Sequence, residues 1–458
     1  MNASAGVLVA LVSLAAACGP TPVGSDDDDH GGDGGREPPP PAGNVTGTVW
    51  APGNAIGAVA VGYEIPVAGA MVYLAATPTP PIPDQVYCDR CQLHPTSFVA
   101  TDAKGRFVLA GVPAGQHRLV IEKAQFRLET MIDVPPQQGL TVPAAQTTLP
   151  SQHDPAHGRW LPRVAIAIGD SDHIEDIFGK MGMLELDGAG RVIEASFAAT
   201  DRIELYGNPT DPPFSSQHQG SITELFGDLD RMKRYHIIFV PCNYESNVTP
   251  LATPAMRRNI QDYVAAGGKL YVTDWSAEWE DAAFPEFIRF DVDHDTTAAM
   301  ASAGAINPGD GDFGHFALHA RAADPGLAAW LDGQRAPLVI PIGGEELDFP
   351  SEYAAGTIAA DDFVVEGNWT LIRELPAVPI GTDPAGNPVT NTARTWISGD
   401  YQGVYYPHTV SFEPSCGRVL YSTYHTAQQT HPGLVPQERV LLHLIMEIGV
   451  CNAGPDID

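Results

Sequence analysis

The sequence predicts a chain of mixed β and α/β class, in which a small all-β sandwich precedes a doubly wound domain with a parallel sheet and insertions. Short alternating strands separated by turn signals fill residues 44–150. Apolar strand-like runs alternate with helical stretches over residues 160–451. The chain has 458 residues, 44% of them hydrophobic, which is enough for two or three domains with cores of their own.

The N-terminus predicts export. Residues 5–17 are apolar or small, and Cys18 follows at once. Such a stretch is too short to span a bilayer permanently. Residues 1–18 resemble a bacterial lipoprotein signal peptide, which implies that Cys18 becomes the lipidated N-terminus and anchors the protein to a membrane. Gly19 in place of Asp favours the outer membrane, and an ordinary secretory signal cut at the same position is the alternative.

The composition after the signal segment predicts a tether and an acidic surface. Residues 19–43 are dominated by Asp, Gly and Pro, so we expect a disordered tether. Lys and Arg total 25 against 56 Asp and Glu, a net charge of −31. This charge excludes nucleic acid as a partner, and it leaves membrane attachment to the lipid. Residues 291–295 and 309–312 allow calcium ligation, but a solvated anionic surface is the simpler explanation, and we expect no metal and no cofactor.

The cysteine spacing predicts two disulfides, because an exported chain can keep them. Cys88 and Cys91 form a CxxC in a Pro-rich loop, where a local disulfide is favoured over a redox or zinc site. Cys416 precedes a strand and Cys451 follows the last helix, so we pair these two.

Residues 44–150 contain strand patterns at 45–49, 67–74 and 117–121, and a predicted hairpin at 98–109. The strings V-A-G-A-x-V, T-D-x-x-G-R-F and G-V-P-A-G-x-H occur in this order. Together they resemble the carboxypeptidase regulatory-like domain, a transthyretin-like β-sandwich. The resemblance implies a module without catalytic residues, which acts as a spacer or as a carbohydrate- or protein-binding accessory.

Residues 160–451 alternate between strand and helix patterns, which predicts a parallel sheet covered on both faces. Residues 285–390 read mainly as acidic, Gly-rich and Pro-rich loops. The expected strands lie at 163–168, 203–206, 236–240, 269–273, 393–397, 403–412 and 418–423, and the expected helices at 174–181, 222–232, 253–266 and 435–448.

Three strings carry a second resemblance: Y-H-I-I-F-V-P-C-N, I-Q-D-Y-V-A-A-G-G-K-L-Y-V-T-D and C-G-R-V-L-Y-S-T-Y-H-T. They are similar to class I glutamine amidotransferase-like domains of the trehalose-utilisation type, which implies a flavodoxin-like sheet. In that family the strand after the Gly-Gly step leads into a Gly-x-Cys-x-Gly elbow. Here residues 273–277 read Thr-Asp-Trp-Ser-Ala, and Ala427 stands two residues after His425 where the family has Glu. These departures argue against amidotransferase chemistry.

Polar side chains follow four of the predicted strands. Ligands of open parallel sheets bind beyond the carboxyl ends of the strands, so we expect these side chains to gather at one edge. The alternative is that the ends of strands are polar simply because loops meet water. The predicted ligand-binding residues are Asp170, Asp172, His173, Asn243, Tyr244, Glu245, Asp274, Trp275, Glu278 and His425.

Catalysis at this edge remains an alternative to binding. Cys242 or Ser276 could act as a nucleophile with His425 as its base. The sequence favours a non-catalytic role, in which the domain binds a glycan or another component of the cell envelope, because aromatic faces beside carboxylates suit a sugar ring. An exported hydrolase that uses Cys242 or Ser276 with His425 is the rival interpretation.

Overall fold

The structure is a computed structural model, and contacts divide it into Met1–Pro40 and Pro41–Asp458. The predicted signal segment with Cys18 lies outside the described residues, as does the tether up to residue 41. Within the described part of the chain, no helix is both long and apolar enough to cross a membrane. The structure describes residues 42–53, 64–90, 95, 97–169, 172–207, 214–242, 251, 253–290, 296–297, 299–300, 303, 305, 316–332, 334–336, 340–341, 352–353, 356–368, 370–426, 431 and 433–450.

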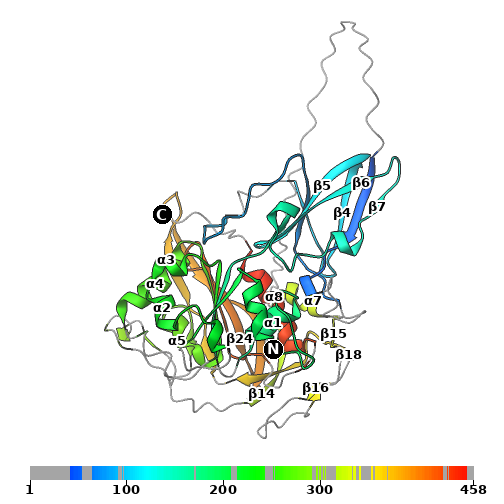
Figure 1. Cartoon of the computed structure of the whole chain (residues 1–458). Helices are drawn as coiled ribbons and strands as arrows, with labels where there is room; N and C mark the ends of the chain where they lie inside the picture. The colour runs from blue at the N-terminus through cyan, green and yellow to red at the C-terminus, as the bar shows by residue number, and fades with distance from the viewer. Residues whose placement is uncertain are drawn as a thin grey trace, which may run out of the picture. The chain divides into compact units, whose positions relative to one another are not determined.

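Two sheets form the predicted sandwich (Figure 1). Strand β1 begins at Ala42, inside the range expected to be tether, because Ala42 and Gly43 already pair with strand β4. The first sheet has the order β4-β1-β7, with β1 (Ala42–Thr48), β4 (Arg106–Pro113) and β7 (Leu140–Thr141). The second has the order β3-β2-β5-β6-β8, with β2 (Met71–Ala75), β3 (Val99–Ala100), β5 (Gly115–Lys123), β6 (Phe126–Val134) and β8 (Arg159–Trp160).

The predicted hairpin at 98–109 is wrong in one respect. Its turn forms, with Gly105 N donating to Asp102 O at 2.8 Å. However, β3 pairs with β2 and β4 pairs with β1, so the two strands enter different sheets. Thr101 explains the switch, because its buried hydroxyl accepts from Ala70 N at 2.9 Å and donates to Val67 O at 2.6 Å. These bonds hold the chain against the second sheet just before the turn.

A nine-stranded sheet forms the centre of the α/β region. Its parallel half has the order β10-β9-β11-β12-β25, which is 2-1-3-4-5 in chain order and therefore flavodoxin-like, as predicted. These strands are β9 (Val164–Ala167), β10 (Ile203–Tyr206), β11 (Ile237–Val240), β12 (Lys269–Thr273) and β25 (Arg418–Ser422).

The other half of this sheet is antiparallel, so the sheet is mixed rather than wholly parallel. The sequence predicted β23 and β24 but missed β14 and β19, whose surroundings read as loops. These strands are β24 (Val404–Phe412), β23 (Arg394–Tyr401), β14 (Phe316–Ala322) and β19 (Phe363–Asn368). Residues 285–390 also hold short paired strands: β13 (Arg289–Phe290) with β20 (Ile372–Glu374), β15 (Arg335–Ala336) with β18 (Gly356–Thr357), β16 (Ile340–Pro341) with β17 (Glu352–Tyr353), and β21 (Ala377–Thr382) with β22 (Pro388–Thr392).

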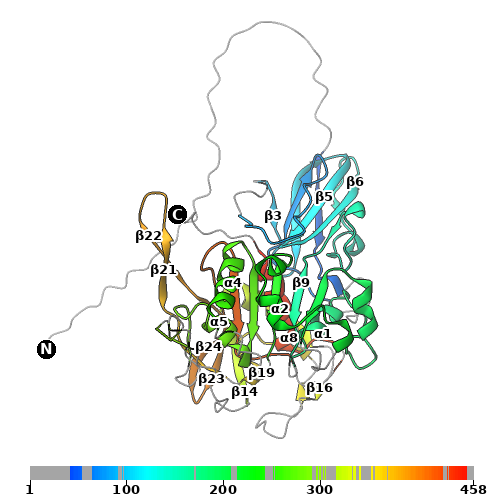
Figure 2. The same cartoon turned by 60° about the vertical axis from the view of Figure 1, so that its left-hand side comes forward.

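Helices cover both faces of the parallel half (Figure 2). Alternate strand residues enter different cores: Ile237 joins one apolar cluster and Ile238 the other. The predicted helix at 222–232 is broken, because Gly227 ends its first part and the Asp228 side chain caps a second. One face carries α1 (Ile174–Lys180) and α8 (Pro436–Ile448); the other carries α2 (Ile222–Phe226), α3 (Leu229–Met232), α4 (Pro254–Ala265) and α5 (Glu278–Asp281).

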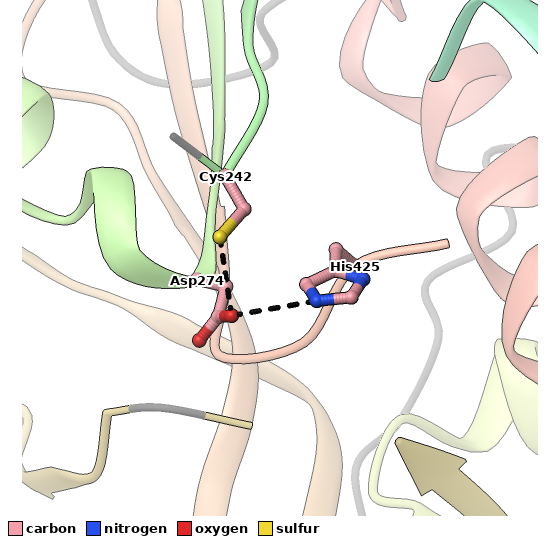
Figure 3. A group of neighbouring side chains, drawn as sticks. All are labelled: Cys242, Asp274 and His425. Atoms are coloured by element: carbon pink, nitrogen blue, oxygen red, sulfur yellow. Dashed lines mark hydrogen bonds and ion pairs between the residues drawn. The ribbon is translucent and has the colours of Figure 1, made fainter. Parts of the chain in front are cut away.

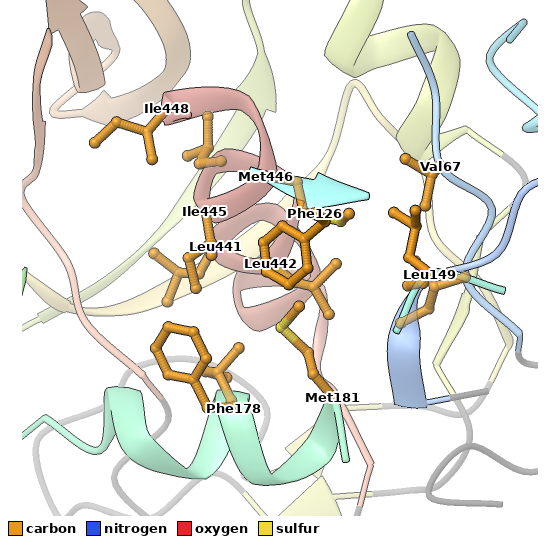
Figure 4. Close-up of a cluster of buried hydrophobic side chains, with 14 of the residues drawn as sticks. Val67, Phe126, Leu149, Phe178, Met181, Leu441, Leu442, Ile445, Met446 and Ile448 are labelled. Carbon is orange, nitrogen blue, oxygen red and sulfur yellow. The ribbon is translucent and has the colours of Figure 1, made fainter. Parts of the chain in front are cut away.

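Helix α8 is buried around nearly its whole circumference. In Figure 4, Leu441 and Ile445 of this helix lie near Phe178 of α1, and Phe126 of the sandwich lies on the same side as Leu442. One apolar cluster runs continuously from the sandwich strands to this helix. The C-terminal helix therefore belongs to a core that both regions share.

The Pro-rich segment after β2 lies along the amino ends of the parallel strands. Val86 N donates to Lys233 O at 2.9 Å, and His236 Nε2 donates to Pro83 O at 2.8 Å, just before β11. A Cβ added to Gly267, before β12, would lie 2.1 Å from Tyr87 O. The amino edge of the sheet is thus covered by a loop from the sandwich.

A disulfide closes this edge and corrects both predicted pairings. Cys88 bonds to Cys416, with a Cα–Cα distance of 5.6 Å across 328 residues of sequence. Cys91 and Cys451, the partners expected for them, lie outside the described residues. The predictions used the CxxC spacing and the positions of Cys416 and Cys451 beside predicted elements, whereas the docked loop brings Cys88 to the start of β25. Cys242 is the unbonded cysteine among the described residues, and it is buried.

Candidate functional site

Three side chains meet beyond the carboxyl ends of the parallel strands (Figure 3). Cys242 lies two residues after β11, Asp274 directly follows β12, and His425 lies three residues after β25. These are three neighbouring strands, and β9 and β11 flank the position where the chain reverses its winding direction. The topology therefore delivers these residues to the edge at which ligands of such folds bind.

The cluster is compact and shielded from water. Cys242 Sγ lies 3.4 Å from Asp274 Oδ2, and His425 Nε2 lies 3.7 Å from the same oxygen. The donor atoms of all three residues lie within 4.8 Å of one another. Cys242 is 1% exposed, and both other side chains are fully buried.

Asp274 occupies the tight turn between β12 and the short helix that follows. Its φ is +45°, in the left-handed region that only a few side chains tolerate without strain. Tyr421 donates its hydroxyl hydrogen to Asp274 O at 2.9 Å and fixes this backbone. The strained turn forms although the elbow glycines are missing, and its apex carries a carboxylate instead of a thiol.

Asp172 ties together the loops that carry the cluster. Its Oδ2 accepts from the Thr273 hydroxyl at 2.5 Å, and its Oδ1 accepts from Thr426 N at 3.1 Å and from the Thr426 hydroxyl at 2.8 Å. Thr273 Oγ1 in turn accepts from Cys242 N at 2.9 Å. Asp172 therefore acts as a buried connector between the ends of β11, β12 and β25.

His425 is held by its backbone and by its ring. Its carbonyl oxygen accepts from Gln437 Nε2 of α8 at 2.7 Å, and its Nδ1 lies 2.7 Å from Thr426 O. A carbonyl oxygen only accepts, so Nδ1 carries the hydrogen. Gly367 packs against the ring, and a Cβ there would lie 2.5 Å from Nε2.

The electrostatic surroundings oppose a thiolate nucleophile in this cluster. Burial and then the Asp274 carboxylate raise the pKa of Cys242 well above its usual value. Burial lowers the pKa of His425. Both groups are therefore neutral at pH 7, which is the opposite of the charged cysteine–histidine pair that nucleophilic catalysis requires.

Ser276 does not form the predicted pair with His425. Its hydroxyl donates to Pro241 O at 2.7 Å, and the side chain is buried. Because the Ser276 hydroxyl hydrogen is donated to a backbone carbonyl, the described residues show no hydrogen bond from Ser276 to His425.

The other predicted ligand-binding residues fall into two groups. His173 N donates to the Thr426 hydroxyl at 2.8 Å, so the loop after β9 reaches the same edge. Trp275 is half-buried, and Glu278 is fully buried at the start of α5. Asp170, Asn243, Tyr244 and Glu245 lie outside the described residues.

Sequence reasoning named Asp172 but missed the hydrogen-bonding and packing roles of four further residues that hold the cluster in place. Thr273, Thr426 and Tyr421 stand in the strings that suggested the fold, but nothing in them marks hydrogen bonds to Asp172 or to the turn at Asp274. Gly367 lies in a stretch that gave no signal.

Two cavities lie away from this cluster. One, of about 760 Å³, is lined by residues around the end of α1 and by Thr200–Arg202, and the other, of about 490 Å³, lies beside the Pro-rich segment near Tyr73 and Arg127. Neither is lined by Cys242 or His425, whose side chains are buried.

No protein-family profile matches the chain, and no curated protein does. Solved structures similar to it include a putative ThuA-like protein from Bacteroides uniformis ATCC 8492, with 10% identity, a TM-score of 0.31, and coverage of 64% of this chain and 92% of that one. A β-galactosidase from Rahnella sp. R3 has 11% identity and a TM-score of 0.27; Gan42B, a GH42 β-galactosidase, has 12% and 0.24. This chain covers 32% and 30% of these two enzymes, and they cover 64% of this chain. The fold described above rests on the chain's own strand order.

Proposed function

We propose that the protein is an exported lipoprotein, anchored through Cys18, whose α/β region binds a polar component of the cell envelope without amidotransferase chemistry. A glycan is the ligand class that we favour. The sandwich acts as a spacer between the anchor and this region. The outer membrane is the proposed location.

One observation carries the proposal: the apex of the turn after β12 holds Asp274 in place of a nucleophilic cysteine. The nearby Cys242 has a raised pKa, so it is a poor nucleophile at pH 7. Polar side chains nevertheless gather at this edge, where hydrogen bonds through Asp172, Thr273 and Thr426 offset the cost of burying them. Half-buried Trp275, directly after Asp274, supplies an aromatic face for a sugar ring.

The binding test uses the purified full chain on a panel of envelope glycans. We expect wild-type protein to bind a subset and Trp275→Ala to lose that binding. Tyr405→Ala is a matched control, because Tyr405 is an exposed aromatic residue on β24. Loss of glycan binding in the control, or no binding by the wild type, would contradict the proposed ligand class.

Labelling experiments test the rival and the anchor. Serine- or thiol-directed probes that modify Ser276 or Cys242, with loss of labelling in His425→Ala, would establish the hydrolase instead. Incorporation of radioactive palmitate that disappears in Cys18→Ser is the result expected for the lipid anchor.

A further inference from the structure

We propose that Cys242, Asp274 and His425 form a Zn²⁺-binding site. The inference goes beyond the proposed function, because the ion binds here whether or not a glycan does. Thiolate sulfur, imidazole nitrogen and carboxylate oxygen are the donor types that zinc takes in proteins. The chain supplies one of each from three neighbouring strands, within 4.8 Å of one another.

The donor separations fit a tetrahedral ion. Zinc bonds of ~2.3 Å to sulfur and ~2.1 Å to oxygen or nitrogen place sulfur ~3.6 Å from oxygen, and nitrogen ~3.4 Å from oxygen. The observed separations are 3.4 Å for Cys242 Sγ to Asp274 Oδ2 and 3.7 Å for His425 Nε2 to Asp274 Oδ2. Cys242 Sγ and His425 Nε2 lie at most 4.8 Å apart, and a tetrahedral ion would place them ~3.6 Å apart. Rotation of the two side chains can shorten this distance by the required ~1.2 Å or less.

The histidine has the tautomer that metal binding requires. Nδ1–H donates to Thr426 O at 2.7 Å, so the neutral ring presents the lone pair of Nε2 towards the cluster. Histidine ligands of metals commonly donate their other ring N–H to a carbonyl or a carboxylate, which fixes the ring and raises its basicity. The same hydrogen bond is present here before any ion is considered.

The charges balance when the ion binds. One thiolate and one carboxylate carry two negative charges in a place shielded from water, and Zn²⁺ neutralises both. Binding replaces the S–H bond of Cys242 by an S–Zn bond, and the proton leaves to solvent. Three protein donors leave a tetrahedral ion one further position, which an oxygen of water or of a ligand fills.

The supporting residues make the cluster rigid. The Asp172 network holds the loops after β11, β12 and β25 at fixed positions. Tyr421 fixes the strained backbone of Asp274, and Gly367 packs on the imidazole ring. Such preorganisation favours a small ion over a flexible ligand.

The test measures metal content and affinity on the full chain. Protein stripped with a chelator is dialysed against Zn²⁺, and bound zinc is measured by mass spectrometry. We expect one zinc per chain in the wild type. Cys242→Ser and His425→Gln lower the affinity for zinc by about 100-fold or more. His319→Gln, at an exposed histidine on β14, is the matched control and keeps the wild-type affinity.

If Cys242→Ser or His425→Gln fails to fold, a spectroscopic measurement tests the metal site without changing its three ligands. Co²⁺ is added to a full-length variant in which Cys18, Cys91 and Cys451 are replaced by serine. Because Cys88 and Cys416 form the disulfide, Cys242 is then the one thiol left to bind the ion. We expect a sulfur-to-cobalt charge-transfer band. Absence of this band, or a wild-type zinc content no higher than that of folded His425→Gln, would overturn the proposal, whereas failure of the glycan panel alone would leave it standing.

Discussion

The two edges of the parallel sheet are built in different ways. The amino edge is covered by the Pro-rich loop and crosslinked by the Cys88–Cys416 disulfide. The carboxyl edge carries a buried set of donor groups, Cys242, Asp274 and His425, held by hydrogen bonds and by a strained turn. The amino edge is therefore stabilised by a covering loop and a crosslink, whereas the carboxyl edge holds buried polar side chains in fixed positions.

Both edges are fixed by contacts that are remote in sequence. The disulfide spans 328 residues, and the hydrogen bond from the Thr426 hydroxyl to Asp172 spans 254. At the amino edge a covalent bond restrains the unfolded chain, whereas at the carboxyl edge the restraint acts only in the folded state. Changes at the two edges should therefore separate stability from ligand binding.

The largest expected effect on stability belongs to the disulfide. Replacing Cys88 and Cys416 by serine should lower the free energy of unfolding by about 2–5 kcal/mol, because the crosslink closes a very long loop. Urea unfolding under non-reducing conditions measures this change. Zinc affinity should remain within a few-fold of the wild type, and a joint loss of stability and metal affinity would show that the two edges do not act independently.

Acid should weaken the amino edge through His236. Burial and the Lys269 charge lower the pKa of His236 from 6.5 to about 4. As the pH falls, His236 takes up a proton in the unfolded chain before it does so in the folded protein. The free energy of unfolding that neutral His236 contributes above pH 6.5 is therefore lost as the pH falls from 6.5 to 4. The depression corresponds to roughly 3 kcal/mol at the acid limit.

Urea unfolding at several pH values compares the wild type with His236→Gln. Glutamine keeps a donor for Pro83 O and an acceptor for Arg163 N, the two partners of the imidazole. The variant should show a shallower loss of stability between pH 6.5 and 4. Equal slopes would assign the acid sensitivity to other buried histidines, such as His443.

At the carboxyl edge, Gly367→Ala should cost about 1–3 kcal/mol of stability. The φ of Gly367 is +79°, and the added Cβ would lie 2.5 Å from His425 Nε2. The displaced ring should also lower the affinity for zinc. Gly386→Ala is the control, because its φ is also positive but a Cβ there meets nothing within 4 Å, so it should leave the zinc affinity unchanged.

The smallest effect is expected at the ion pair between Asp84 and Arg202 at the amino edge. The Asp84 side chain is 61% exposed, and the buried Arg202 keeps Asp201 as a second carboxylate partner, so Asp84→Ala should change the free energy of unfolding by less than ~1 kcal/mol. Thermal unfolding at low and high salt measures this difference. A larger loss would mean that the Pro-rich loop is held by charge rather than by its backbone hydrogen bonds and the disulfide.

Local patterns predicted much of this fold. The apolar run before Cys242 and the Gly-Gly step before Lys269 marked strands β11 and β12 and the helix between them. The flavodoxin-like sheet was predicted from the resemblance, and its parallel pairing from the alternating strands and helices. Strands β14 and β19 were missed because antiparallel pairing depends on distant partners, and their flanking sequence is rich in Gly, Pro and Asp.

The candidate site was predicted in its placement but not in its geometry. Parallel topology alone brings Asp172, Cys242, Asp274 and His425 to one edge. The hydrogen bonds through Thr273 and Thr426 depend on loop conformations that no periodicity encodes. The disulfide partners were wrong because pairing depends on the path of a docked loop rather than on sequence spacing.

The most direct test of the contrast between the two edges is an anomalous difference map from crystals of the full chain grown with Zn²⁺. We expect a peak bonded to Cys242 Sγ, Asp274 Oδ2 and His425 Nε2. A map in which Cys242 Sγ stays 3.4 Å and His425 Nε2 stays 3.7 Å from Asp274 Oδ2, with no peak between the three atoms, would contradict this expectation.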